Sequence, residues 1–340
     1  MSQRPADSEP ARGCGPSQTT SEADKVAICV CTYRRPQGLG RLLLGLAALR
    51  FPTVAPPPEI SIVLADNDPA GSGAEVVATM RHEVPWPIVY VHEPRRGLSF
   101  VRNATLDAVP DDARWIAFID DDEEPTPDWL DALLATARAY DAPIVAGPVR
   151  PVFQEEPASW VVEGGFFRLG PYVDGGIPPT ISTNNALIEA VHIRRAGWRF
   201  DPAFNLTGGE DQHFFSRAVA AGLTAVTSAD AEVVETVPPS RTTLRWLLRR
   251  HFRMGTTLAT IDLMRRRSIG SVMVRAGKGA ARMGLGAVQL IGALGGGRAR
   301  AAAAACNVAW GAGSLAGLLG LGYQEYGPGR LAKLPRRSET

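Results

Sequence analysis

"WIAFIDDDEEPTPDWL", residues 115–130, decides the fold class of this chain. Five apolar residues run directly into five acids, Asp120 to Glu124, and Pro125 and Pro127 precede an expected helix start at Asp128. A short apolar run bounded by turn-forming residues is typical of a buried strand. Neighbouring carboxylates at the end of such a strand disfavour one another's ionisation. We therefore expect a positively charged group to lie against them.

Strand-like and helix-like segments alternate before this stretch. Apolar, β-branched runs predict strands over 25–32, 59–68 and 87–93. Leucine and valine at helical spacing predict helices over 39–49 and 74–82, and a loop beginning at residue 94 leads into a third helix. This alternation implies a parallel α/β sheet whose ligand-binding loops follow the carboxyl ends of the strands.

The pattern is less regular beyond residue 140. Residues 154–180 are rich in glycine, proline and aromatic residues, which predicts a largely loop-built segment. Around it, the patterns predict a strand within 141–149, a strand leading into a helix over 182–197, a helix over 208–222 and further strand over 223–236.

The composition changes near Pro238 and Pro239. Residues 237–340 contain 17 Lys or Arg and 3 Asp or Glu, although the whole chain has a formal charge of only +1. Residues 301–324 carry no charge and are mostly alanine and glycine, so they can span a bilayer, lie in its interface or pack on the globular part. No nucleic-acid-reading motif is present, and we expect the basic region to meet an anionic membrane surface, not nucleic acid.

The first residues and the cysteines indicate the compartment. Residues 1–24 are rich in polar residues, proline and glycine and lack the apolar core of a signal peptide, which predicts a disordered leader. Cys29 and Cys31 lie on one face of a predicted strand and do not suggest a disulfide framework. A reducing, cytosolic setting fits this cysteine usage best.

Acids at two predicted strand ends are candidate ligand-binding groups. Asp120, Asp121 and Asp122 offer the hard oxygen donors that suit Mg²⁺ or Mn²⁺, although a solvated acidic loop is the simpler alternative. Asp66 and Asn67 end another strand at the same expected edge and can bind a nucleobase and ribose, or can simply form a turn.

Two further motifs carry chemistry. In "RRGLSFVRNA", Arg95, Arg96 and Arg102 can contact a diphosphate, and Asn103 can donate a hydrogen bond from its amide. The alternative is that these arginines are simply solvent-exposed and bind no ligand. "GGEDQHFF" places Glu210 and Asp211 at an expected helix start, where Asp211 is either a general base or the helix N-cap.

In order and spacing, these motifs resemble glycosyltransferase family 2, of the GT-A fold, and in particular its bacterial branch of succinoglycan-type exopolysaccharide assembly. The resemblance covers about residues 25–235 and rests on "VAICVCTYRRP", "IVLADNDPAGS", "RRGLSFVRNATL", "WIAFIDDDEEPTPDWL", "STNNALI" and "GGEDQHFFSRAVAAG". The fold it implies is an α/β, Rossmann-like GT-A domain followed by a mainly helical, membrane-associating extension.

The resemblance assigns residues to a nucleotide-sugar donor. Asp66 and Asn67 would contact uracil or another base, and Asp120 would lie near the ribose. The full set that it implies for donor binding is Thr32, Tyr33, Arg34, Asp66, Asn67, Arg102, Asn103, Asp120 and Asp121.

It also implies a metal and a catalytic pair. Asp122 would hold Mg²⁺ or Mn²⁺, with Asp120 and His213 as further candidate ligands, although packing among aromatic residues explains His213 equally simply. Asp211 would be the general base, supported by Glu210. Contacts with the acceptor or the diphosphate are implied for Asn184, Asn185, Arg245 and Trp246.

The implied reaction is an inverting, metal-dependent transfer of a sugar, from a UDP-sugar by expectation, to a hydroxyl of a glycan or lipid-linked acceptor in surface polysaccharide assembly. Thr242 stands where processive members carry the glutamine of Q-x-x-R-W, which argues against a processive synthase. Residues 160–176 would form an acceptor-side loop, although core packing explains Phe166 and Phe167 equally well.

Two alternatives stay open. A sugar nucleotidyltransferase shares this plan but normally begins with a glycine-rich, basic loop, which "CTYRRPQG" does not match. A non-catalytic nucleotide-sugar binding protein would need no base at Asp211. The sequence contains no phosphate-loop, dinucleotide-binding, nucleophile-elbow or paired-cysteine motif. No motif therefore supports a kinase, a dehydrogenase or a hydrolase.

The expected organisation has three parts. A leader over 1–24 precedes a GT-A domain over 25–237, with a nucleotide half (25–125) and an acceptor half (126–237). A basic and Ala/Gly-rich helical region over 238–340 follows. We expect a cytoplasmic enzyme at the inner face of the inner membrane, either peripheral to it or embedded in it.

Overall fold

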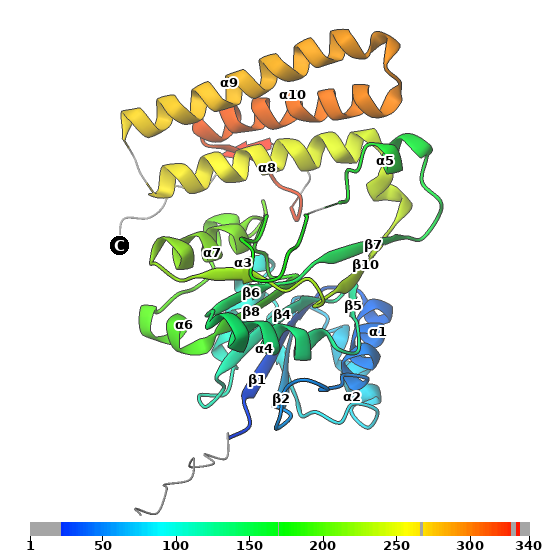
Figure 1. Ribbon diagram of the computed structural model, residues 1–340, viewed down its shortest axis with the longest axis vertical. Coiled ribbons are helices and arrows are strands. Elements are labelled where there is room, and N and C mark those ends of the chain that lie inside the picture. The colour runs from blue at the N-terminus through cyan, green and yellow to red at the C-terminus, as the bar shows by residue number, and fades with distance from the viewer. Residues whose placement is uncertain (1–21, 169, 266–267, 328–330, 334–340) are drawn as a thin grey trace, which may run out of the picture.

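The computed structural model describes residues 22–168, 170–265, 268–327 and 331–333. Most of the expected leader therefore lies outside the described residues. A helix-flanked sheet forms one body of the molecule, and a layer of three long helices covers one end of it (Figure 1).

The first half of the chain is a run of parallel strands joined by helices. The strands are β1 (Lys25–Thr32), β2 (Glu59–Asp66), β3 (Ile88–His92) and β4 (Trp115–Asp120), and the connecting helices are α1 (Pro36–Ala47), α2 (Gly73–Met80) and α3 (Leu98–Asp107). The alternation predicted for this half is confirmed. Thr32 is paired with Asp66, and Cys31 with Asp120, so the ends of β1, β2 and β4 are aligned.

The second half completes a mixed sheet of order β3-β2-β1-β4-β8-β6-β9. Its elements are α4 (Trp129–Tyr140), β6 (Ile144–Ala146), β8 (Asn185–Glu189), α6 (Ala190–Ala196), α7 (Glu210–Ala220) and β9 (Ala225–Thr227). β8 is antiparallel to β4 and β6, so the prediction of a parallel sheet is wrong for this strand. The chain reaches β8 through a long irregular segment instead of a single crossover helix, and such a connection does not impose a parallel return.

A second sheet of order β5-β10-β7 lies beside the acidic run. It contains β5 (Glu123–Pro125), β7 (Val149–Phe153) and β10 (Val233–Val237), and β5 is antiparallel to β10. The last acids of the run are therefore held in a strand. The short helix α5 (Ser159–Glu163) follows β7, and the rest of the segment up to β8 contains no other helix or strand among its described residues.

Two apolar cores hold the main sheet. On one face Leu39 of α1, Val77 of α2 and Leu130 of α4 pack against the strands. On the other face Leu106 of α3 and Phe214 of α7 do so. Both faces of the central strands are buried, which explains their nearly continuous apolar sequence.

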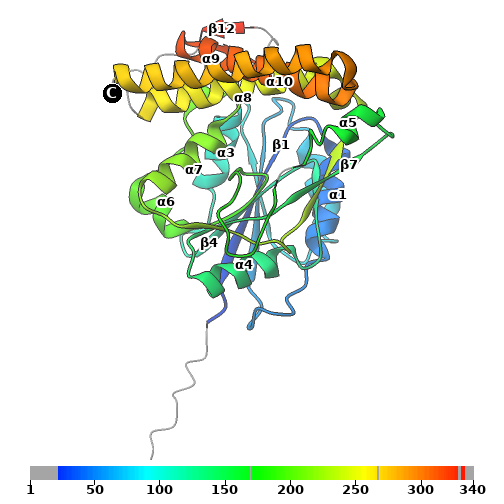
Figure 2. The same ribbon diagram turned by 45° about the horizontal axis from the view of Figure 1, so that its top comes forward.

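The helical layer is built from α8 (Leu244–Arg265), α9 (Ile269–Gly292) and α10 (Arg298–Leu318), and it lies across the end of the sheet (Figure 2). α10 packs along both α8 and α9. Among the described residues it is the one helix long and apolar enough to cross a membrane by length and composition, and 39% of its most apolar window is buried inside the molecule. A short hairpin, β11 (Leu321–Tyr323) with β12 (Leu331–Lys333), follows.

Candidate active site

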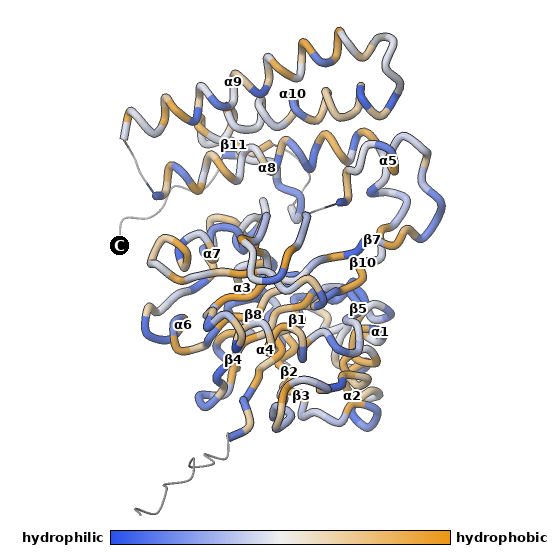
Figure 3. Tube along the Cα trace, viewed as in Figure 1, coloured by the Kyte–Doolittle hydropathy of each residue, from blue (hydrophilic) through white to orange (hydrophobic). Residues whose placement is uncertain are grey.

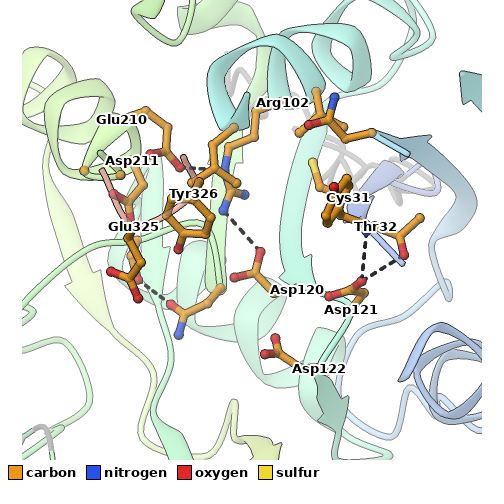
Figure 4. Close-up of a pocket in the computed structure, with 18 of the residues that line it drawn as sticks. Cys31, Thr32, Arg102, Asp120, Asp121, Asp122, Glu210, Asp211, Glu325 and Tyr326 are labelled. Carbon is orange, nitrogen blue, oxygen red and sulfur yellow. Dashed lines mark hydrogen bonds and ion pairs between the residues drawn. The ribbon is translucent and has the colours of Figure 1, made fainter. Parts of the chain in front are cut away.

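A cavity of about 520 Å³ lies at the carboxyl ends of β1 and β4, between the sheet and α8. Charged side chains dominate its lining (Figure 4). The acids are Asp120, Asp121, Asp122, Glu123, Glu210, Asp211, Glu235 and Glu325, and the bases are Arg35, Arg96, Arg102, Arg241, Arg250 and Arg253. The lining therefore contains more carboxyl groups than guanidinium groups.

Arginines supply the positive charge that we expected against the acidic run. The buried Asp121 accepts hydrogen bonds from Thr32 Oγ1 at 2.8 Å and from Arg35 Nη1 at 2.7 Å. Arg35 also lies 3.1 Å from Asp122, which Arg241 of the segment before α8 approaches at 3.3 Å. Despite Arg35, burial raises the pKa of Asp121 to about 6. The run is therefore a structured part of the cavity, not a solvated loop.

Arg102 connects the acidic run to the start of α7. Its side chain is buried, and it donates from Nε to Glu210 Oε1 at 3.0 Å and from Nη2 to Asp120 Oδ1 at 3.2 Å. Burial alone would lower the pKa of Arg102, but the carboxylates of Asp120 and Glu210 outweigh burial and raise that pKa well above its ordinary value. This guanidinium is permanently charged and holds the two halves of the site together.

Glu210 and Asp211 are adjacent in sequence but differ in environment. Glu210 is 2% exposed, and burial together with the charge of Asp211 raises its pKa to about 7. Asp211 is less buried and lines the cavity, and its Oδ1 accepts the N–H of Gln212 at 2.7 Å. α7 begins at Glu210 with Gly209 as its N-cap, so the alternative in which Asp211 is the cap is wrong. The positive φ of Gly209, 91°, turns the chain and brings both acids into the first helical turn.

Most of the predicted site residues line this one cavity. They are Thr32, Tyr33, Asn67, Arg102, Asp120, Asp121, Asp122, Asn184, Glu210, Asp211 and Trp246. They come from seven separate parts of the sequence, and the aligned ends of β1 and β4 bring Thr32 and Tyr33 close to the acidic run.

Other predicted residues lie outside the cavity lining and have structural contacts. Asp66 is fully buried and accepts the N–H groups of Asp68 at 2.8 Å and Gly73 at 2.6 Å, which is the turn-forming alternative. The Asn103 amide binds the backbone of Phe200 through both of its polar atoms. Arg34 pairs with Asp68 at 3.0 Å.

Three more predicted residues also lie outside the cavity lining. Asn185 accepts from Trp129 Nε1 at 2.8 Å and donates to two backbone carbonyls. His213 is buried against the ring of Phe204, with 5.1 Å between the ring centroids. Arg245 is exposed at the start of α8 and does not line the cavity.

The sequence reasoning missed several residues of the cavity. Arg35 lies inside the quoted stretch "VAICVCTYRRP" and Arg241 directly precedes Thr242, but neither was assigned a role. Arg250 and Arg253 belong to the basic helix α8. Glu325 and Tyr326, from the far C-terminal region, also line the cavity. One signal was available, because Glu325 is the only acid between Asp262 and Glu339.

The segment expected to form an acceptor-side loop contacts a residue of the cavity lining, although none of its described residues lines the cavity itself. The ring of Phe167 stacks on Trp246, with 5.9 Å between centroids and 8° between the ring planes, and it also contacts Phe153 edge-on. Phe166 packs against Trp160 instead. Phe167 therefore joins this segment to α8 at Trp246, which lines the cavity.

The donor set of the cavity fits a divalent cation. Within the parts of the chain that the structure describes, no cluster of three or more His, Cys, Asp or Glu forms a complete metal site. Asp120 and Asp122 both line the cavity (Figure 4), and Mg²⁺ or Mn²⁺ is commonly held by one or two carboxylates together with substrate phosphate oxygens. Asp121 is engaged by Thr32 and Arg35.

Comparison with known proteins agrees with this geometry. Residues 27–195 match the family described as Glycosyl transferase family 2. The chain is 39% identical over 237 residues to the succinoglycan biosynthesis protein ExoM of Rhizobium meliloti (strain 1021), which covers 70% of this chain and 75% of that protein.

Solved structures support the same fold. A mannosyltransferase from Pyrobaculum calidifontis, PcManGT, in complex with GDP-Man and Mn²⁺, superposes with a TM-score of 0.59 at 16% identity over 88% of each chain. S. aureus TarS 1-349 in complex with UDP superposes with a TM-score of 0.50 at 15% identity, over 93% of this chain and 98% of that one. The chain therefore belongs to glycosyl transferase family 2 and is a glycosyltransferase of the GT-A fold.

Proposed function

We propose that this enzyme transfers a sugar from a nucleoside-diphosphate sugar, of the UDP class, to a hydroxyl of a glycan or lipid-linked acceptor, with inversion at the anomeric carbon. The observation that carries the proposal is that Asp211 lines the same cavity as Asp120 and Asp122 (Figure 4). The 39% identity to a succinoglycan biosynthesis protein supports a role in surface polysaccharide assembly.

The nucleotide lies on the β1 side of the cavity in this proposal. Thr32, Tyr33 and Asn67 line that side, and Asp121 is hydrogen bonded to Thr32. The diphosphate faces the arginines that line the cavity, among them Arg241 and Arg250. Arg250 is largely buried close to Arg253 and Arg241, and burial together with these cations lowers its pKa, so an added phosphate would relieve their repulsion.

The metal belongs to the same proposal. Asp122, with Asp120 as a second oxygen donor, would hold Mg²⁺ or Mn²⁺ in contact with the donor diphosphate. When bound, the cation supplies charge neutralisation for the leaving nucleoside diphosphate. Arg241 lies 3.3 Å from Asp122 and would then be available to the diphosphate.

Asp211 performs the proton transfer. Its carboxylate accepts the proton of the acceptor hydroxyl, and the acceptor oxygen attacks the anomeric carbon from the face opposite the diphosphate. As the new glycosidic bond forms, the bond to the diphosphate oxygen breaks and the nucleoside diphosphate leaves with the electron pair. Glu210, with its pKa raised to about 7, stays largely protonated below that pH and so adds little negative charge beside Asp211.

Calorimetric titration with UDP, GDP and dTDP, each with and without Mn²⁺, tests the proposal. We expect metal-dependent binding of one nucleotide, UDP in the first instance, and its loss by at least about tenfold in Asp122→Ala, because the carboxylate that holds the cation is removed. Asp111→Ala, at an exposed loop position outside the cavity, is the matched control. Failure of all three nucleotides to bind a folded sample would rule out the proposed donor site.

We also propose that the helical region 238–340 holds the enzyme at the cytoplasmic face of the inner membrane. Residues 263–324 contain eight Lys or Arg and no acid. In this proposal α9, and not residues 301–324, lies in the bilayer interface. Large apolar side chains are exposed along α9: Ile269, Met273, Val274, Leu285, Val288 and Ile291. Figure 3 shows α9 as the outermost helix of the layer, farthest from the sheet. An amphipathic, basic helix of this kind suits a bilayer interface.

A further inference from the structure

The C-terminal segment returns from the helical layer to the catalytic cavity. β11 packs on α8 and α10, and the chain then reaches the loop that precedes α7, where the Tyr326 N–H donates to the carbonyl of Leu206 at 3.0 Å. Arg253 of α8 lies 2.6 Å from the carboxylate of Glu325. These two anchors tie residues 325 and 326 to the loop and to the helix that bound the cavity.

The loop before α7 is shaped to admit this segment. Gly208 has a φ of +73°, and a Cβ on it would clash with Arg253 Nη1 and lie 3.1 Å from the ring of Tyr326. Gly209 follows with a φ of +91°, and a Cβ there would clash with Thr257 of α8. The pair of glycines therefore serves a close approach of α8 and the C-terminal segment as well as the turn into α7.

Glu325 and Tyr326 lie on the Asp211 side of the cavity. In Figure 4 they stand beside Asp211 and Glu210, whereas Thr32 and Asp121 lie across the cavity from them. Tyr326 is 38% exposed and lines the cavity. A tyrosine phenol is protonated at neutral pH, so Tyr326 presents a hydroxyl donor and an apolar ring to the cavity.

Such a pair matches the chemistry of a sugar ring. A carboxylate accepts hydrogen bonds from sugar hydroxyls, and an aromatic ring packs on the apolar face of a pyranose while its hydroxyl finds a polar partner. A few polar groups placed in this way fix the orientation of a ligand in a cavity. The general base needs the acceptor hydroxyl within hydrogen-bonding reach, so an adjacent wall that orients the acceptor would decide which hydroxyl reacts.

We propose that Glu325 and Tyr326 form the acceptor-binding wall of this enzyme and orient the sugar whose hydroxyl Asp211 deprotonates. This inference rests on the proposed function, because it takes Asp211 as the base and the opposite side of the cavity as the donor site. Arg253 is the positioning residue that holds Glu325 in the wall.

Titration of octyl β-glucoside and octyl β-galactoside into the full-length enzyme saturated with UDP and Mn²⁺ tests the wall. We expect one glycoside to bind the native enzyme and its affinity to fall at least about tenfold in Tyr326→Ala and in Glu325→Gln, since each variant removes a contact to the sugar. UDP affinity should stay within about twofold, because the nucleotide lies on the far side. In transfer assays with the same glycoside, KM should rise while kcat falls less.

Tyr323→Phe is the matched control, because Tyr323 belongs to the same segment but does not line the cavity. Tyr326→Phe keeps the ring and should lose less affinity than Tyr326→Ala, which guards against a folding defect in the alanine variant. Unchanged glycoside affinity in Tyr326→Ala and Glu325→Gln would overturn the wall while leaving the donor site intact. Absence of glycoside binding to a native enzyme that binds UDP would also overturn it, as would a rise in turnover at constant KM.

Discussion

At the scale of single residues, the site depends on how buried charges are paired. Arg102 is shared by Asp120 and Glu210, so one guanidinium serves two acids that come from different elements. The low dielectric around Glu210 favours its neutral form, whereas Asp211 faces the cavity. Glu210 thereby adds little negative charge to the cavity below about pH 7, which suits the proposed role of Asp211 as the base.

The raised pKa of Glu210 predicts a pH-dependent stability. Its pKa rises from an ordinary 4.5 to about 7 on folding, so the stabilisation is fully present below 4.5 and is lost as the pH rises through 7. We expect the stability of the ligand-free enzyme to fall as the pH rises from about 4.5 through 7. Glu210→Gln, which does not titrate, should remove up to a few kcal/mol of that loss in the free energy of unfolding.

Differential scanning calorimetry across this pH range measures the effect. Glu163→Gln, at an exposed position of α5, should keep the native slope. Asp121, Glu123 and Glu235 also have raised pKa values and contribute in the same direction, so the slope should be reduced and not abolished. An identical slope in native enzyme and Glu210→Gln would contradict the assignment.

At the scale of elements, glycines set the distance between α8 and α10. A Cβ at Gly313 of α10 would clash with the carbonyl of Phe252 in α8, and a Cβ at Gly255 of α8 would clash with the carbonyl of Trp310 in α10. The two backbones are therefore in direct contact. Because α8 also carries Arg250 and Arg253, this contact positions part of the cavity.

Gly313→Ala should separate the two helices. We expect it to destabilise the enzyme by about 1–3 kcal/mol, because an added methyl group forces packed backbones apart. Gly277→Ala on α9, where a Cβ would meet nothing within 4 Å, should instead stabilise by up to about 1 kcal/mol through the higher helix propensity of alanine. Urea unfolding followed by far-UV circular dichroism compares the two. Equal effects of both substitutions would show that the close approach is not needed.

Local patterns predicted the elements better than their directions. β1, β2 and β4 were predictable because each is a buried apolar run with its own turn residues. The antiparallel direction of β8 was not predictable, since it depends on where the irregular segment 154–184 leaves the sheet. The single strand predicted within residues 141–149 is also divided, because these residues contribute to two strands, β6 and β7, that belong to different sheets.

At the scale of the whole molecule, charge and apolar surface are segregated. The acidic α/β body carries the cavity, whereas the helical layer has 17 Lys or Arg against 3 acids from residue 237 onward. The exposed apolar side chains of α9 lie on this basic layer. A surface that is both basic and apolar is suited to an anionic bilayer, which attracts the charges and buries the side chains.

Flotation with vesicles tests this surface. We expect the native enzyme to float with vesicles that contain phosphatidylglycerol and to bind phosphatidylcholine vesicles more weakly. Val288→Asp combined with Ile291→Asp should reduce partitioning at least about tenfold, since two exposed apolar side chains can no longer be buried. Point substitutions are preferable to deletion of residues 285–340, because the deletion also removes Glu325 and Tyr326 from the cavity.

Val173→Asp, at an exposed position of the segment before β8, is the control for added charge. High salt should weaken binding of the native enzyme, because it screens the attraction to anionic lipid. A native enzyme that stays with the soluble fraction at every lipid composition would refute the membrane role. If the native enzyme is a dimer and the double variant is a monomer, the α9 face binds a second copy of this chain and not a membrane.

The order of strands and helices in the first half, the acids at the ends of β2 and β4, and the acidic pair at the start of α7 could all be read from the sequence, because each is a local pattern of apolarity or charge. Only tertiary structure decided which arginines neutralise the acidic run, and that Glu325 and Tyr326 line the same cavity as Asp211. These arrangements bring together residues far apart in the chain, and side-chain chemistry becomes specific only when packing removes the water between such residues.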